Sequence, residues 1–221
     1  MGYTRPEIRS LEFRDAAGAV IPFGERWADR DDGPPEDAYS REEHPERFAP
    51  LHTIAEALIA HLRDAYDVAV WEGTASFSEL LNAPGIDEST RAVRITPRDP
   101  HCAPITLTFT DLPGVMLTSG YYSDTAFPSC GCSACDETWE EEGARLEDHV
   151  LAIVAGGFTE RAWPSPWREL RAPDGSWAES GSVQEGTVPA ERLATAEARL
   201  AELRRAHPAG NWQPWPVRVR P

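Results

Sequence analysis

The sequence predicts an α+β fold: a single domain with a mostly antiparallel sheet packed against three main helices, and irregular N- and C-terminal arms. Apolar residues recur at helical spacing in three stretches, and short alternating segments stand between them. The order helix, strands, helix, strands, helix is typical of α+β proteins. No shift in composition divides the 221 residues. We expect an N-terminal arm over residues 1–45, the domain over 46–206 and a tail over 207–221.

The N-terminal arm is rich in turn-forming and charged residues. Leu11 to Phe13 and Val20 to Phe23 are candidates for two short strands, and Trp27 is expected to hold the arm on the body. In the C-terminal tail, Trp212 and Trp215 stand among prolines. We expect this tail to lie over apolar surface.

Three helices are predicted from their apolar stripes. His44 and Pro45 suit an N-cap and a first helical position, and the helix that follows runs to about Tyr66. The second helix is expected from about Glu137 to Gly156, and the third opens at Pro189. The stripes consist of Phe48, Leu51, Ala55, Leu58 and Leu62, then Trp139, Leu146, Val150 and Ile153, then Leu193, Ala196, Leu200 and Leu203.

The strand candidates fall in two groups, one on each side of the second helix. Ile105, Leu107 and Phe109 alternate with threonines, which is the pattern of a half-buried strand. A turn over 111–114 then leads to a returning strand over 115–119. The other predicted strands cover 68–71, 93–96, 158–163, 167–172 and 177–183, with a short helix over 77–81 and a turn over 82–85.

The formal net charge of −16 restricts the partners of the protein. Nucleic acids and anionic membranes are excluded, because both are held by basic surfaces and no basic stripe is visible. A cationic ligand or a basic protein fits this charge, which also serves solubility. The first six residues contain no apolar run, so we expect no signal peptide and a cytoplasmic location.

Cys130, Cys132 and Cys135 lie within six residues, just before the second helix. Thiols stay reduced in the cytoplasm, where clustered cysteines indicate a metal site or catalysis rather than structural disulfides. Structural zinc takes four nitrogen or sulfur ligands, and a Cys-x-x-Cys turn presents two of them. Gly131 gives the chain freedom for a third thiol to join. The cluster therefore predicts three ligands of a zinc ion.

The fourth ligand must come from elsewhere, and Cys102 is the first candidate. If residues 105–110 and 115–120 form a hairpin, Cys102 lies near the end from which the cluster departs. His101, His149 and Asp136 are the alternatives. A site with three protein ligands and an exchangeable water would instead be catalytic in style.

Two other readings of the cysteines remain open. Cys132 and Cys135 have the spacing of a redox dithiol, but the βαβ context of such motifs is missing. The acidic flank that starts at Asp136 and Glu137 would also raise the pKa of a thiol, whereas a reactive thiolate needs it lowered. The cysteines could also form a disulfide or remain unligated as small apolar side chains.

Three segments together resemble an uncharacterised family of high-GC Gram-positive bacteria, a domain of unknown function. They include Pro22 to Trp27 with the preceding Asp15 to Gly18, then His44 to His52, and Phe127 to Glu137, which reads F-P-x-C-G-C-x-A-C-D-E. The resemblance covers nearly the whole chain and implies no activity, substrate or cofactor. The family's pattern has no obligatory cysteine at Cys102, which favours a disulfide or an Asp or His ligand.

Three functions follow as hypotheses. The first is a cytoplasmic, zinc-stabilised protein that acts by binding a partner. The second is an enzyme that uses the cysteine cluster as an open zinc site or as a dithiol. The third is an acidic inhibitor or immunity-type protein that masks a basic partner, for which the net charge of −16 is the only support.

Overall fold

The computed structural model describes residues 2–9, 11–75, 86–87, 89–183, 188 and 190–219. Within these residues, helices and two antiparallel sheets confirm the predicted α+β fold. In chain order the elements are η1 (Glu36–Ser40), η2 (Pro45–Phe48), α1 (Pro50–Ala65), β1 (Val68–Thr74), β2 (Arg91–Pro97), β3 (Ile105–Phe109), β4 (Val115–Ser119), β5 (Ser123–Phe127), α2 (Trp139–Val154), β6 (Phe158–Arg161), β7 (Trp167–Arg171), β8 (Ala178–Ser182) and α3 (Ala190–Ala206).

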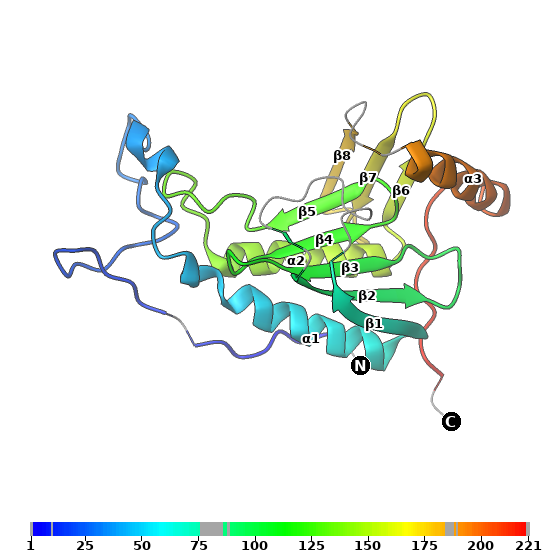
Figure 1. Ribbon diagram of the computed structural model, residues 1–221, viewed down its shortest axis with the longest axis horizontal. Coiled ribbons are helices and arrows are strands. Elements are labelled where there is room, and N and C mark those ends of the chain that lie inside the picture. The colour runs from blue at the N-terminus through cyan, green and yellow to red at the C-terminus, as the bar shows by residue number, and fades with distance from the viewer. Residues whose placement is uncertain are drawn as a thin grey trace.

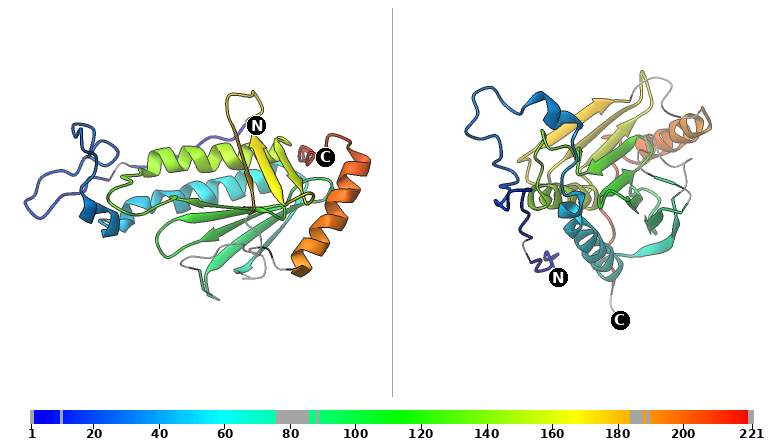
Figure 2. Two further views of the ribbon diagram at one scale, coloured as in Figure 1. Left: turned by 90° about the horizontal axis from the view of Figure 1, so that it is seen from above. Right: turned by 60° about the vertical axis from the view of Figure 1, so that its left-hand side comes forward.

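The two sheets are simple meanders in which each strand pairs with its neighbour in the chain. The larger sheet has the order β1-β2-β3-β4-β5, and the smaller one has the order β6-β7-β8. Helices α1 and α2 lie side by side over one face of the larger sheet, and α3 packs near β6 (Figures 1 and 2). None of the helices in the described part of the chain is long and apolar enough to cross a membrane.

The core lies between the two helices and the larger sheet. The inward stripe of α1 includes Leu51, Leu58 and Leu62, which are all fully buried. Leu146 is the fully buried leucine of α2. Burial of each such side chain contributes roughly 1.5–3 kcal/mol. The helices meet closely at Gly143, where an added Cβ would lie only 2.4 Å from Cδ1 of the buried Ile54. An alanine at this position would therefore require the side chain of Ile54 to shift.

The predicted start of the first helix at Pro45 is wrong. Pro45 opens the short 3-10 helix η2, and α1 begins at Pro50. A proline inside an α-helix lacks the N–H for the intrahelical bond, and its ring clashes with the carbonyl four residues earlier. A continuous helix from Pro45 would place Pro50 in such a position, whereas Pro50 fits well in the first turn of α1. The second helix begins at Trp139, two residues after the predicted start.

Strands β3 and β4 confirm the predicted pair at 105–109 and 115–119. The fifth strand, Ser123–Phe127, was not predicted, because its polar sequence lacks the apolar alternation of a half-buried strand. In the N-terminal arm, the two expected strands are reduced to one isolated bridge between Arg14 and Val20. The predicted helix over 77–81, the turn over 82–85 and the helix start at position 189 lie outside the described residues.

The C-terminal tail lies over apolar surface, as expected. Trp212 and Trp215 are each only 3% exposed. The backbone N–H of Trp212 donates to the carbonyl of Phe158 at 2.9 Å, and the indole of Trp215 donates to the carbonyl of Ala103 at 3.0 Å. The two tryptophans thus connect the tail to the smaller sheet and to the segment before β3.

The buried carboxylate of Glu160 on β6 joins three separate parts of the chain. It accepts hydrogen bonds from the backbone N–H groups of Tyr121 and Tyr122, at 2.9 and 2.6 Å, and from the indole of Trp212 at 2.9 Å. Burial raises the pKa of Glu160 to about 7, although these donors favour the charged form. The β4–β5 turn, the smaller sheet and the tail therefore meet at one titratable group.

The raised pKa of Glu160 predicts a decrease in stability as the pH rises. Between about pH 4.5, where the unfolded chain releases this proton, and about pH 7, the folded state still holds it. The contribution of Glu160 to the free energy of unfolding should therefore fall by about 3 kcal/mol across this window. The free energy of unfolding can be measured by urea denaturation at several pH values. We expect Glu160→Gln to reduce its decrease between about pH 4.5 and pH 7. Glu202→Gln, at an exposed position on α3, should keep the pH dependence of the wild type. Equal pH dependence of stability in the two variants would show that Glu160 is not its source.

Candidate metal centre

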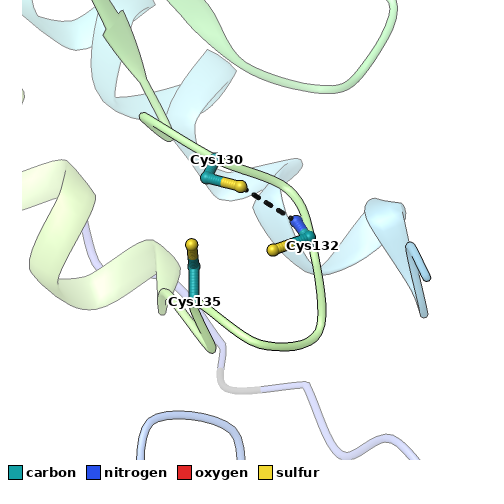
Figure 3. A group of neighbouring side chains, drawn as sticks. All are labelled: Cys130, Cys132 and Cys135. Atoms are coloured by element: carbon teal, nitrogen blue, oxygen red, sulfur yellow. Dashed lines mark hydrogen bonds between the residues drawn. The ribbon is translucent and has the colours of Figure 1, made fainter. Parts of the chain in front are cut away.

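The loop between β5 and α2 brings Cys130, Cys132 and Cys135 together. Their sulfur atoms all lie within 4.8 Å of one another and face a common centre (Figure 3). Three thiolates around a tetrahedral zinc ion, with Zn–S bonds of about 2.3 Å, would stand about 3.8 Å apart. The sulfurs therefore need to move by only about 1 Å or less to hold such an ion. All four cysteines of the chain are free thiols in the structure.

The polypeptide of the loop directs hydrogen-bond donors at the sulfurs. The backbone N–H of Cys132 donates to the sulfur of Cys130 at 3.4 Å (Figure 3). Burial alone would raise the pKa of Cys132, but hydrogen bonds from the backbone of Cys135 and from the neighbouring thiols outweigh it, and the pKa is lowered. The hydrogen bond to Cys130, together with burial, raises the pKa of Cys135 to about 12.

The accessibility of these thiols is uneven. Cys132 is buried, Cys130 is partly exposed and Cys135 is exposed. A nucleophilic cysteine needs access to its substrate as well as a low pKa. The buried position of Cys132 therefore limits access from solvent to the Cys132–Cys135 pair.

The N-terminal arm holds the cysteine loop through main-chain hydrogen bonds. The N–H of Ser133 donates to the carbonyl of Arg41 at 2.7 Å, and that of Ala134 donates to the carbonyl of Ala38 at 3.2 Å. The indole of Trp27 donates to the carbonyl of Ser133 at 3.0 Å. The expectation that Trp27 fastens the arm to the body agrees with this contact. The arm and the loop lie next to each other at the end of the molecule away from α3 (Figures 1 and 2).

Asp136, directly after the cluster, fixes the arm by its carboxylate. The backbone has a left-handed φ of 51° at this residue, and the φ of Gly131 lies outside that region. One carboxylate oxygen of Asp136 accepts from the backbone N–H groups of Gly24 and Arg26, both at 2.9 Å. The other oxygen lies 3.6 Å from Nε of Arg26. The unusual backbone conformation that we expected at Gly131 therefore occurs at Asp136, whose side chain also holds the loop against the arm.

A second arginine, Arg47, is buried against the same loop. It is 2% exposed, and its guanidinium donates to the carbonyl of Gly131 at 3.2 Å and stacks on the ring of Phe48 at 4.3 Å. Among the residues that the structure describes, no carboxylate forms an ion pair with it within 4.0 Å. Burial and the nearby charge of Arg26 lower the pKa of Arg47, and the charges of Asp136, Cys132 and Glu137 act in the opposite direction. The loop thus packs against a buried cation that has no carboxylate of the described residues within ion-pair distance.

The structure does not bring Cys102 to the cluster. Cys102 lies before β3, at the Ser123 end of β5, and its thiol donates to the carbonyl of Pro214 at 3.3 Å. The cluster follows Phe127 at the other end of β5, a strand of five residues and therefore about 17 Å long. The expected proximity of Cys102 to the cluster is wrong because the unpredicted strand returns the chain to the opposite end of the sheet.

The alternative fourth ligands have other partners. Asp136 is held by the arm, as described. His149 is buried on α2, where its ring stacks on Trp177 and lies 3.5 Å from Glu179 of the smaller sheet. The ring of His101 contacts His207 at 4.9 Å, close to Cys102. The group of potential ligand atoms in the described part of the chain consists of the three clustered cysteines.

No chemical pattern in the sequence distinguishes Arg26 and Arg47 from the other arginines. Both stand within the segments on which the family resemblance rests, Pro22 to Trp27 and His44 to His52. In the structure these segments meet the third one, Phe127 to Glu137, at the cysteine loop. The family resemblance of the three segments, taken together, therefore pointed to Arg26 and Arg47. No spacing of residues within a single segment did so.

The fold and the loop define an α+β protein with a cluster of three thiols that can hold a metal ion. The chain matches the family of unknown function DUF6226 over residues 9–219, and it belongs to that family. The prediction from the three segments of a family without an assigned function is thereby confirmed. No curated protein and no solved structure matches the chain.

The buried carboxylate of Asp136 predicts a large effect of a small substitution. Asp136→Asn keeps an acceptor and tolerates the left-handed backbone, but it removes the charge beside the partly buried Arg26 and near the buried Arg47. We expect a loss of about 3 kcal/mol in the free energy of unfolding, measured in urea.

The matched control is Asp37→Asn in the same arm, where the exposed carboxylate lies 3.4 Å from Arg41. This substitution should cost less than about 1 kcal/mol. Similar losses in the two variants would show that Asp136 is not the residue that fastens the arm.

Proposed function

We propose that Cys130, Cys132 and Cys135 bind a zinc ion, and that the bound ion fixes the N-terminal arm as part of a partner-binding surface. The observation that carries this proposal is the convergence of three sulfurs within 4.8 Å in a loop that the arm holds. Thiolate ligands favour zinc over the hard cations magnesium and calcium. The protein would act in a reducing compartment such as the cytoplasm, where these thiols remain available.

The charge around the loop supports an anionic metal centre. Three thiolates and one Zn²⁺ ion carry a net charge of −1, which is unfavourable in a buried position without a counterion. The buried guanidinium of Arg47 donates to the loop itself, at the carbonyl of Gly131. A negatively charged centre would supply the close counterion that this arginine lacks. The acidic flank opposes the site less than the sequence indicated, because Asp136 faces Arg26.

The open side of the cluster leaves room for a fourth ligand. Cys135 is exposed and Cys130 is partly exposed, so the fourth coordination position faces the solvent. A water molecule or a side chain of a bound partner would occupy it. With a net charge of −16 on the chain, a basic protein is the partner class that electrostatic attraction favours.

Zinc analysis of four single variants tests the proposal. We expect about one zinc per chain in the wild type purified without added metal. Cys130→Ser, Cys132→Ser and Cys135→Ser should each weaken zinc binding by at least about 100-fold, because each removes one of three ligands. Cys102→Ser, a buried thiol at the far end of β5, is the matched control and should bind as the wild type does.

Two results would contradict the zinc site. One is a wild-type protein with fully titratable thiols and no bound metal. The other is a loss of zinc in Cys102→Ser as large as in Cys132→Ser, which would require a different arrangement of ligands.

Removal of the metal should loosen the arm but not the body. After chelation we expect the amides of Ser133 and Arg26 to exchange hydrogen at least about tenfold faster, because their acceptors lie across the contact between arm and loop. The amides of Tyr121 and Tyr122, which donate to Glu160, serve as internal controls and should keep their rates. If the exchange rate at Ser133 is unchanged in metal-free protein, the metal does not stabilise the contact between the arm and the loop.

A further inference from the structure

The face of the larger sheet that points away from α1 and α2 carries a row of polar side chains. The strand register places Trp71, Arg94, Thr106, Thr118 and Asp124 directly opposite one another, one from each of the five strands. Residues paired in this way in antiparallel strands lie on the same face. Four of the five are polar, so this face differs from the apolar face under the helices.

The first turns of α3 border a cavity that lies over one end of this row and is open to solvent. The cavity has a volume of about 430 Å³, which is within the range of small-molecule sites. It lies between the polar face, the β4–β5 turn and α3. Figure 1 shows that this turn and α3 are at the end of the sheet opposite the loop between β5 and α2. The described residues that line it include Arg94, Thr106, Thr118, Tyr121, Arg192 and Thr195.

Two polar atoms of the lining lack hydrogen-bond partners. Thr118 is only 6% exposed, and its hydroxyl has no partner among the described residues. The same holds for the buried Nη1 atom of Arg192. A buried polar group without a partner is unfavourable, and such groups mark positions where a ligand can complete the hydrogen bonds.

The charge of the cavity differs from that of the whole chain. The protein carries −16, yet two arginines, Arg94 and Arg192, are among the residues that line the cavity. Glu191 is the carboxylate within the described lining, and it is exposed, while the buried carboxylate of Glu160 lies behind Gly120 and within range of the charge of Arg192. Guanidinium groups bind phosphate and carboxylate oxygens in a paired geometry, and the hydroxyl of Thr118 can bind a hydroxyl group of a ligand.

The cavity is also held in shape before any ligand arrives. Gly120 and Tyr121 belong to the turn whose backbone N–H groups donate to Glu160. An added Cβ on Gly120 would lie 2.1 Å from the carboxylate of Glu160, so this turn is packed directly on the smaller sheet. A preorganised site loses less entropy when a ligand binds.

We propose that this cavity binds a small organic anion, with its phosphate or carboxylate group held by Arg192 and Arg94 and a hydroxyl-bearing body held by Thr118. The site is separate from the cysteine cluster, and neither proposal depends on the other. A sugar phosphate and a hydroxylated dicarboxylate represent the two sources of such an anion.

Binding of three probes to the full chain tests the proposal. We would titrate a hexose phosphate, malate and the neutral hexose, at up to about 10 mM, and follow binding by calorimetry and NMR. At least one of the two anions should bind, and the neutral hexose should not. Arg192→Gln should weaken the binding of that anion by at least about tenfold. Arg205→Gln, an exposed arginine in the last turn of the same helix, makes the same charge change and should have no effect.

A second variant separates binding from folding. Thr118→Val keeps the shape of the side chain and removes a hydroxyl without a partner, so the variant should be at least as stable to heat as the wild type. Its affinity for the anion should nevertheless fall. The proposal is overturned if neither anion binds to the wild type, if the neutral hexose binds equally well, or if Arg192→Gln and Arg205→Gln bind alike.

Discussion

The carboxylate of Asp136 joins parts of the chain that are 112 and 110 residues apart, through the N–H groups of Gly24 and Arg26. The arm contains little regular structure of its own, so its backbone donors need partners outside the arm. Asp136 provides two of these partners, and the loop that carries it also carries the three thiols. The position of the cysteine cluster therefore depends on this contact as well as on strand β5, which ends three residues before Cys130.

The opposite end of the molecule is fixed in a related way. There the carboxylate of Glu160 accepts from the N–H groups of Tyr121 and Tyr122, and so holds the β4–β5 turn against the smaller sheet. In both places a buried acid fixes a turn by its main chain rather than by side-chain packing. The two sites differ in their closest partners. Asp136 lies 3.6 Å from an arginine, whereas all the hydrogen-bond donors of Glu160 are neutral and Arg192 acts on it only through its charge.

The sequence predicted what depends on local periodicity. The helices around Leu58 and Leu146, and the strand with Ile105 and Leu107, follow from apolar spacing that is visible within one segment. The grouping of the three clustered cysteines follows from their spacing of two and three residues.

Contacts between distant segments could not be predicted in this way. Strand β5 has no apolar pattern, because its residues outside Ser123 and Phe127 are only partly buried. Because β5 was not predicted, the cysteine cluster was expected at the wrong end of the sheet. The expected proximity of Cys102 to the cluster was wrong for the same reason. Arg47 looks like any surface arginine in the sequence, and only the tertiary fold buries it.

The separation between the arm and its partners also affects how the chain is made. During synthesis the arm leaves the ribosome before α1 and the larger sheet, and it must wait for Ser133 and Asp136 to emerge. At roughly 5–20 residues per second, a gap of 112 residues corresponds to about 6–22 seconds. Throughout that interval Trp27 has no docking site, and the nascent arm is the part of the chain most open to chaperones and proteases.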